Sequence, residues 1–189
     1  MAASIHPSTV YLSSHFVVAA GSVLFRLSPE TYKLQICILY HRQTGEWRLP
    51  KGRKDCGESV DVAAVRETFE ETGYRCELIV CRMPTRAPKP GVNAIDSVET
   101  LTDISEPFAV IISDQGERGI KMIWWFLTRV KSGSHDKVDG TQTNTEQFDS
   151  HFVDAEEAAS CLTFQKEREV VAQGLKLVET SLKLGDQLF

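Results

Sequence analysis

A helix that carries three glutamates on one side is the feature that most limits what this chain can fold into. Residues 52–74 read GRKDCGESVDVAAVRETFEETGY, with Glu67, Glu70 and Glu71 at positions i, i+3 and i+4. At that spacing the three carboxylates share one helical face. Like charges so close repel each other, at roughly 0.2–0.5 kcal/mol per pair on an exposed helix. The surrounding fold, or a bound cation, must therefore offset this repulsion.

The sequence also marks the ends of this helix, which we predict over residues 59–72. The acidic and polar pair at 58–59 suits a helix start, where capping groups and negative charge are favoured. Gly73 suits the position just past the helix end, where glycine is common. We expect an apolar stripe on the face away from the glutamates, formed by Val62, Val65 and Phe69.

Divalent cations would explain the acidic face. Mg²⁺ and Mn²⁺ prefer hard carboxylate oxygens and readily bind beside substrate phosphates. Such a metal lowers the pKa of a bound water and neutralises charge on phosphate oxygens. The alternative is an acidic face that simply lies in solvent. The pattern therefore predicts Mg²⁺ or Mn²⁺ as cofactor and metal-assisted chemistry on a phosphate.

The full spacing of the segment resembles the signature of the Nudix hydrolases. It reads G-x5-E-x7-R-E-U-x-E-E-x-G-U, matched by Gly52, Glu58, Arg66, Glu67, Glu70, Glu71, Gly73 and Tyr74. Thr68 departs from the pattern at a position that is more often aliphatic in the family. The resemblance covers roughly residues 15–183 and implies a small-molecule phosphoanhydride as substrate.

The resemblance implies roles for the matching residues. The backbone carbonyl of Gly52 is implied as a metal ligand, Glu58 as a support for the loop, and Arg66 as the residue that orients the carboxylates. The metal-binding carboxylates are implied to be Glu67, Glu70 and Glu71. Which carboxylate accepts the proton from the attacking water varies within the family.

The order of predicted elements indicates an α/β fold. Strands are expected at 16–27, 32–41, 77–82, 108–112, 120–130 and 151–153, with a helix capped by Asp154 and a long amphipathic helix over 164–183. Strands on both sides of a helix favour a mixed sheet sandwiched between helices, and the resemblance implies the same α/β/α Nudix fold. We expect an N-terminal extension (1–14), one Nudix domain (15–183) and a tail (184–189).

Composition and charge narrow the partners and the compartment. The net charge of −5 argues against a broad nucleic-acid surface, so nucleic acid is expected only if the substrate is a capped RNA. No apolar run approaches the roughly 18 residues needed to span a bilayer. The N-terminus lacks a secretory pattern, and the five cysteines contain no C-x2-C pair. A cytoplasmic location is the expectation, with the nucleus as a second candidate; the oligomeric state stays open.

A second resemblance concerns the substrate. Residues 121–131 and 146–165 resemble the matching segments of asymmetrical diadenosine tetraphosphate hydrolases. In those enzymes an acidic residue ten positions before an E-E-A sequence reaches back towards the metals, and that position is Glu146 here. Glu146 is therefore predicted as an additional metal ligand or general base, with an exposed loop glutamate as the alternative.

Three residues near the signature are candidates for substrate binding. The segment Leu49-Pro50-Lys51-Gly52 carries a P-K-G sequence that the dinucleotide and diphosphoinositol branches of the family share. Lys51 could neutralise a phosphate as a flexible point charge, and Arg48 could do so more weakly. Trp124 and Trp125 point to opposite faces of a strand; Trp125 is the favoured candidate for stacking on a nucleobase.

A long segment at 84–107 does not fit the small dinucleotide hydrolases. Loops of this length are usually functional or disordered. Arg86 and Lys89 could grip a highly phosphorylated ligand, which keeps a diphosphoinositol polyphosphate as an alternative substrate. An mRNA cap or another nucleoside diphosphate compound would also suit the signature. A Nudix-type module that binds without hydrolysis is a further reading, and the full set of signature carboxylates argues against it.

Overall fold

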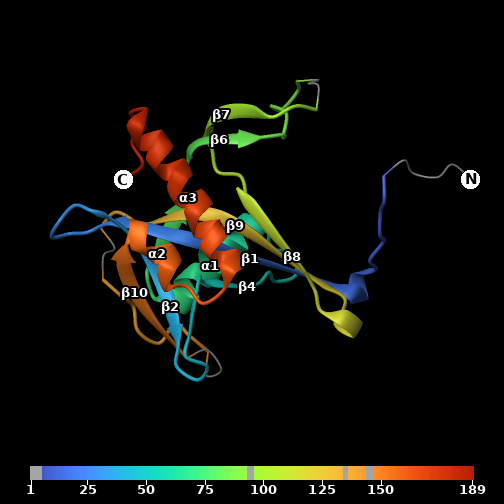
Figure 1. Ribbon diagram of the computed structural model, residues 1–189, viewed down its shortest axis with the longest axis horizontal. Helices are drawn as coiled ribbons and strands as arrows, with labels where there is room; N and C mark the ends of the chain where they lie inside the picture. The colour runs from blue at the N-terminus through green and yellow to red at the C-terminus, as the bar shows by residue number, and fades with distance from the viewer. Residues whose placement is uncertain (1–5, 93–95, 134–135, 144–146) are drawn as a thin grey trace, which may run out of the picture.

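The long strand β1 (Phe16–Leu27) is the centre of an eight-stranded mixed sheet (Figure 1). The computed structural model describes residues 6–92, 96–133, 136–143 and 147–189. The main path of the sheet runs β10–β2–β1–β9–β5. β1 lies parallel to β9 (Ile120–Val130), from the pair Phe16–Ile120 to the pair Phe25–Arg129, and the other pairings are antiparallel.

Three short or edge strands extend this path. β3 pairs with β2, β4 pairs with β1, and β8 pairs with β9. The bounds of these and the remaining strands of the sheet are β2 Leu34–His41, β3 Glu46–Arg48, β4 Lys51–Arg53, β5 Cys76–Leu78, β8 Ala109–Asp114 and β10 Phe148–Asp154. Single 3-10 turns lie at Ser13–His15 and Gly116–Arg118.

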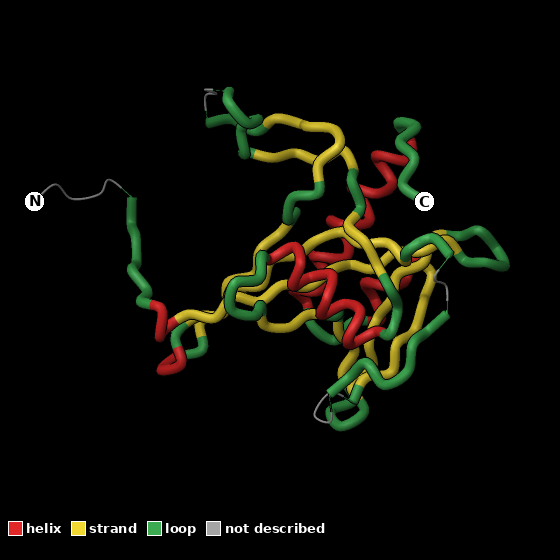
Figure 2. The backbone as a smooth tube through the Cα atoms, turned by 180° about the vertical axis from the view of Figure 1, so that it is seen from behind, coloured by secondary structure: helices red, strands yellow, loops and turns green. Residues whose placement is uncertain are grey.

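Helices cover both faces of the sheet. α1 (Val60–Thr72) lies on the face seen in Figure 2, and α2 (Ala155–Cys161) and α3 (Gln165–Lys183) lie on the face seen in Figure 1. Successive side chains of a strand point to opposite faces. On β1, Val23 accordingly packs in the cluster that includes α3, and Ala20 packs in the cluster that includes α1. The predicted α/β sandwich is confirmed.

The two long strands were well predicted, and the segment at 84–107 was not. β1 and β9 have the bounds expected for them, and α1 begins one residue later than predicted. The segment predicted as a loop contains one strand of a hairpin, because β7 (Glu99–Ile104) pairs with β6 (Cys81–Thr85). Pro84 lies exposed in β6, and a two-stranded hairpin tolerates proline because each strand has a free edge.

The apolar stripe predicted for α1 is wrong at Val62, which is 54% exposed. Val65 is partly buried and packs against the cluster of Leu24, Cys37, Cys76 and Val130. The buried positions of α1 are instead small or polar: Ala63, Ala64, Glu67, Thr68, Glu71 and Thr72. Because alanine and threonine are small, the helix backbone can lie close to β1. Two of the three glutamates are thereby carried into the interior.

A chain of buried hydroxyl groups joins α1 to the sheet and accounts for Thr68. The Thr68 hydroxyl donates to the carbonyl of Ala64 (2.6 Å), so its 2.7 Å contact with Ser22 uses Ser22 as the donor. Ser22 in turn lies 2.7 Å from the Thr128 hydroxyl, which can donate to it. All three hydroxyl-bearing residues are fully buried. An aliphatic residue at 68 would leave the Ser22 donor without that partner, so threonine suits this interior.

No helix in the described part of the chain combines the length and the apolar character that crossing a bilayer requires.

Thr68→Val tests this hydroxyl chain. The substitution keeps the volume but removes the acceptor of Ser22, so the free energy of unfolding should fall by about 1–2 kcal/mol in urea titrations. The double variant Ser22→Ala/Thr68→Val should lose less than the sum of the single variants, because the two hydroxyls share one bond. Strict additivity would contradict the chain.

Thr180→Val is the matched control. Thr180 donates to the carbonyl four residues earlier, as Thr68 does, but it is on an exposed turn of α3. Its replacement should change the free energy of unfolding by less than about 0.5 kcal/mol.

Candidate active site

The segment Leu49–Gly52 lies directly against the centre of the sheet. Lys51 pairs with Gly21 of β1, and an added Cβ at Gly21 would overlap the carbonyl oxygen of Pro50 and lie 2.6 Å from the Lys51 Cβ. Only a glycine at position 21 therefore permits this close approach of β4 to β1. The approach fixes where Lys51 and Gly52 stand relative to α1.

Two buried carboxylates, one from each main helix, accept the backbone N–H groups of this segment. The Lys51 N–H donates to Glu71 Oε2 (2.8 Å), and the Leu49 N–H donates to Glu167 Oε2 (2.8 Å). Glu71 is on α1 and Glu167 is on α3. Buried carboxylates are costly unless they are hydrogen-bonded or paired, and these bonds help to offset that cost.

The carboxylate of Glu67 covers the backbone of Gly52. A Cβ at Gly52 would overlap both carboxylate oxygens of Glu67, so any other residue there would displace that carboxylate. Glu67 and Glu71 are 6% and 4% exposed. Two of the three predicted metal-binding carboxylates thus lie inside the molecule beside the Gly52 backbone, while Glu70 lies nearer the surface.

Arg66 holds the acidic residues of the site together. Its guanidinium donates twice to Glu58 (2.8 and 2.9 Å), once to Glu67 (2.8 Å) and once to Glu70 (2.9 Å). It also donates to the carbonyl oxygen of Arg53 (3.0 Å). These bonds lower the pKa of Glu58 from its ordinary value of 4.5 to about 2, and the same partners raise the pKa of Arg66. Arg66 thereby offsets the repulsion between the carboxylates.

The donor set suits a hard divalent cation. Carboxylate oxygens and a backbone carbonyl are the ligands that Mg²⁺ and Mn²⁺ prefer. Within the described ranges, no three acidic, histidine or cysteine side chains already form a converged ligand set. The three glutamates of α1 accept hydrogen bonds instead: Glu67 and Glu70 from Arg66, and Glu71 from the Lys51 N–H. Residues Gly52, Glu67, Glu70 and Glu71 nevertheless fit the predicted metal by chemistry and by adjacency.

A group of cations flanks the segment on the α3 face. Lys51 and Arg53 pair with Gly21 and Ala19 of β1, and Lys121 pairs with Val17, so their side chains share one face of the sheet. Burial, together with Lys51 and Arg53, lowers the pKa of Lys121. Lys121 was not among the residues predicted from the sequence, although strand alternation in β9 could have indicated it.

Of the predicted substrate residues, Arg48 lies near this group and Trp125 is enclosed. Arg48 pairs with Glu46, and its guanidinium lies 5.0 Å from the ring centroid of Phe164. Trp125 is 0% exposed, because odd-numbered residues of β9 face the core under α3. The structure therefore contradicts the stacking role predicted for Trp125. Trp124, on the other face, is half-buried against the cluster that includes α1.

Two further predicted residues, Arg86 and Lys89, are not brought to this segment. Arg86 and Lys89 follow β6 in the hairpin that stands clear of the main sheet in Figure 1. The hairpin begins where the Arg82 N–H donates to Ser181 (3.1 Å), 14 residues or about 21 Å along α3 from Glu167. Arg86 is exposed and ion-paired with Asp96. Glu146 lies outside the described residues.

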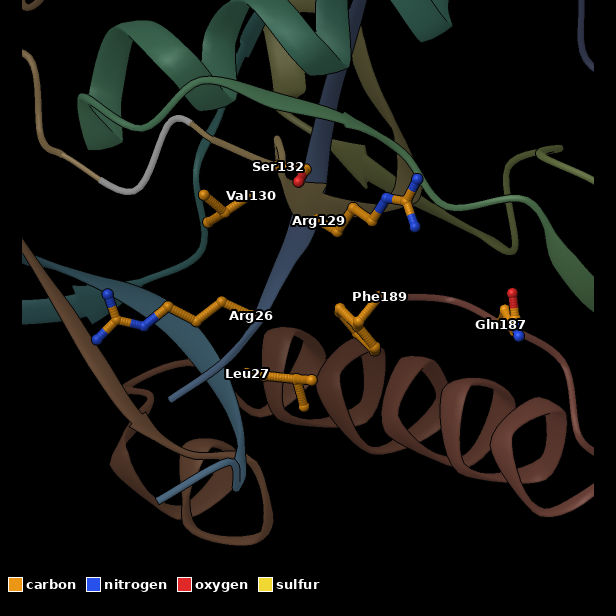
Figure 3. A pocket seen from close by; sticks show the side chains of 7 residues that line it. All are labelled: Arg26, Leu27, Arg129, Val130, Ser132, Gln187 and Phe189. Atoms are coloured by element: carbon orange, nitrogen blue, oxygen red, sulfur yellow. The ribbon is translucent and has the colours of Figure 1, made fainter. Parts of the chain in front are cut away.

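A separate hollow lies at the C-terminal ends of β1 and β9. It encloses about 480 Å³ between Arg26, Leu27, Arg129, Val130, Ser132, Gln187 and Phe189. Figure 3 shows the two guanidinium groups turned to opposite sides of it. Arg26 donates to Gln35, and Arg129 pairs with Glu77, so both cations have partners elsewhere. This hollow does not contain the residues of the candidate site.

Comparison with known proteins identifies the domain. The sequence profile described as the NUDIX domain matches residues 16–172. A protein of Mycolicibacterium smegmatis (strain ATCC 700084 / mc(2)155) named 8-oxo-(d)GTP phosphatase is 38% identical over 77 residues, which are 37% of this chain. Those residues span only about a quarter (24%) of the relative.

Solved structures share the fold over most of their length. The crystal structure of a Caenorhabditis elegans Ap4A hydrolase binary complex has a TM-score of 0.59 at 19% identity, covering 87% of this chain and 98% of that one. A NUDIX family hydrolase from Clostridium perfringens has a TM-score of 0.54 at 16% identity, covering 88% and 99%. At these identities the likeness concerns the fold alone.

The Glu58–Arg66 pair makes a testable prediction about pH. In the unfolded chain Glu58 should titrate at its ordinary pKa of 4.5, and in the folded protein at about 2. The pair therefore stabilises the fold fully above about pH 4.5, and this contribution is lost as the pH falls towards 2. Melting curves of the metal-free protein should show that Glu58→Gln lowers Tm at pH 6 and lowers it less at pH 3.5.

Arg66→Met supplies the control for this prediction. Without the guanidinium, Glu58→Gln should no longer lower Tm more at pH 6 than at pH 3.5. Carboxyl-detected NMR should also find the Glu58 midpoint raised towards its ordinary range. A Glu58 midpoint that does not move on loss of Arg66 would contradict the assignment.

Proposed function

The chain belongs to the Nudix hydrolase family, and on that premise we propose that it is a divalent-metal-dependent enzyme that hydrolyses a diphosphate linkage in a nucleoside or dinucleoside polyphosphate. The observation that carries the proposal is the placement of Glu67 and Glu71. Both carboxylates are buried beside the Gly52 backbone, where a purely structural helix face would place apolar side chains. Buried carboxylates in such a group are typical of a site that binds cations.

In this proposal Glu67, Glu70, Glu71 and the Gly52 carbonyl hold Mg²⁺ or Mn²⁺. Such a cation would supply positive charge against the phosphate chain and make an attacking water more acidic. Arg66 would keep Glu67 and Glu70 on the same side of α1, and Glu58 would anchor Arg66 through two bonds. We keep Glu146 as the proposed general base or additional ligand, because a carboxylate must accept the proton of the attacking water.

Lys51 and Lys121 are the proposed phosphate-binding cations. Both are on the sheet face next to the metal-binding loop, with Arg53 beside them. Cations in this position offset the charge that builds up on the leaving phosphate. Burial and the neighbouring cations lower the pKa of Lys121, and a polyphosphate would add anionic charge beside this group of cations.

Several observations favour a nucleotide substrate over a diphosphoinositol. The M. smegmatis relative is named for a nucleoside triphosphate, and the C. elegans structure for a dinucleoside tetraphosphate. The diphosphoinositol alternative depended on Arg86 and Lys89, yet Arg86 is paired with Asp96 on the distant hairpin. Within the nucleotide class we propose a dinucleoside polyphosphate as the preferred substrate, on the resemblance of residues 121–131 and 146–165.

We propose the cytoplasm as the compartment, with the nucleus as a second candidate. All five cysteines are among the described residues and none forms a disulfide. Burial raises the pKa of Cys37 and of Cys76 to about 12, which keeps these thiols protonated and unreactive. Unpaired thiols suit a reducing compartment.

A product analysis tests the proposed function. The protein is incubated with Mg²⁺ and dinucleoside polyphosphates, nucleoside triphosphates, sugar nucleotides, capped RNA and diphosphoinositols, and products are identified by mass. Dinucleoside polyphosphates should give the highest kcat/KM, and ¹⁸O from water should appear on a single phosphorus. Faster turnover of diphosphoinositols would contradict the proposed dinucleotide substrate. Failure to cleave any compound of the panel would contradict the proposed enzymatic activity.

Glu71→Gln tests the site. The amide can still accept the Lys51 N–H, so the fold should be kept, whereas the loss of charge should lower kcat by about 10²–10⁴-fold. Calorimetric Mg²⁺ affinity should fall in parallel. Glu156→Gln, on an exposed turn of α2, is the control and should match the unmodified enzyme. Normal turnover by Glu71→Gln would remove the metal-binding role of α1.

A further inference from the structure

Glu167 is a buried carboxylate that lies outside the Nudix signature and has no role in the chemistry described so far. It stands in the first turn of α3, and its side chain is 8% exposed. Oε2 accepts the Leu49 N–H at 2.8 Å, and Oε1 lies 4.0 Å from the Lys51 Nζ. The Lys51 side chain is itself only 14% exposed. One carboxylate thus contacts both ends of a three-residue segment.

The bond to Leu49 alone does not require a negative charge. A glutamine could accept the same N–H through its amide oxygen. The charge itself faces Lys51 and, more weakly, Arg48, while burial raises the pKa of Glu167. Burying a carboxylate is costly, so a charged residue at this place needs a charged partner. The Lys51 ammonium is its ion-pair partner.

The start of α3 is fixed firmly to the strand before Lys51. The Trp47 N–H donates to the Thr163 hydroxyl (2.9 Å), and the Thr163 N–H donates to the Trp47 carbonyl (3.0 Å). Glu167 follows four residues later, within the first turn. The position of its carboxylate relative to residues 47–51 is therefore set by these two bonds as well as by its own.

Lys51 is consequently held at two points. Glu71 of α1 accepts its backbone N–H, and Glu167 of α3 lies beside its ammonium group. Lysine side chains are flexible, so a free Lys51 would place its charge at many positions. A carboxylate near the ammonium restricts that spread before any substrate arrives.

We propose that Glu167 is a positioning residue that holds the Lys51 ammonium at the place where the phosphate chain is bound. The inference rests on the proposed function and extends it to α3, a helix outside the signature. A Lys51 ammonium that is already in place needs no reorganisation during hydrolysis, and such pre-organised charge lowers the activation barrier. Glu167 itself does not need to touch the substrate.

Glu167→Gln is the first test. The amide keeps the acceptor for Leu49 and removes the charge beside Lys51. With Mg²⁺ and the best substrate of the panel, kcat should fall about tenfold while KM stays within twofold, because the ammonium still attracts phosphate but is no longer fixed. Glu167→Asp, which withdraws the charge by one methylene, should give a smaller loss. Glu169→Gln removes the same charge from an exposed position of α3 and should match the unmodified enzyme.

A double variant separates positioning from a structural role. In a Lys51→Met background, Glu167→Gln should change kcat by less than twofold, because the residue it acts through is gone. A further tenfold fall in that background would show that Glu167 only supports the fold and would overturn the proposal. So would full activity of Glu167→Gln with Lys51 present.

A measurement without turnover distinguishes failure of this inference from failure of the proposed function. ¹H–¹⁵N spectra of lysine ammonium groups should show a Lys51 signal in the metal-free protein, assigned by its loss in Lys51→Met. That signal should vanish or broaden in Glu167→Gln and persist in Glu169→Gln. An unchanged Lys51 signal in Glu167→Gln overturns the contact, whether or not any polyphosphate is hydrolysed.

Discussion

The burial of acidic side chains against the backbone of residues 51–52 is the constraint on which the rest of the structure depends. Glu67 and Glu71 lie almost wholly inside the protein, where an unpaired carboxylate is strongly disfavoured. Each has a specific compensation: Glu67 accepts a bond from Arg66, and Glu71 accepts the Lys51 N–H. Both bonds lie next to residues 51–52, so they fix α1 relative to this loop. The carboxylates that would repel each other on an isolated helix are thus held in defined positions by their hydrogen-bond donors.

The close approach of the β4 and α1 backbones to β1 belongs to the same constraint. The backbone of Pro50 leaves no room for a Cβ at Gly21, the Glu67 carboxylate lies where a Cβ of residue 52 would stand, and Ala63 and Ala64 bring α1 close to β1. Between these alanines and β1 little room remains for large side chains, and part of the interface is polar. The chain of hydroxyls from Thr128 through Ser22 to Thr68 fills that space with groups that satisfy one another. The departure of Thr68 from the signature therefore follows from what lies beneath it in β1 and β9.

The sequence predicted those strands and helices whose ends are set by neighbouring residues. β1 and β9 are long apolar runs, and α1 is bounded by a polar start and a glycine, so their positions followed from the sequence. Predictions failed where the partner is remote. Val62 was wrongly predicted to be buried, because the buried face of α1 is set by its contact with β1. Trp125 was wrongly predicted to bind a nucleobase, because strand alternation defines two faces but does not say which one the core encloses. Glu167 could not be told from Glu169 by sequence, because only the docking of α3 on Leu49 separates them.

Both helical layers bind one short segment of the chain, and this gives the site its asymmetry. α1 supplies carboxylates from one face, and α3 supplies a single carboxylate from the other; between them runs Leu49–Gly52, with cations on the α3 side. A phosphate chain that lies along this segment would have acidic groups suited to cations on one side and fixed ammonium groups on the other. Charge on the phosphate would then be balanced from both faces of the sheet. Because Lys51 is bound through its backbone to α1 and lies beside the carboxylate of α3, a change in the seating of either helix must reach the same ammonium group.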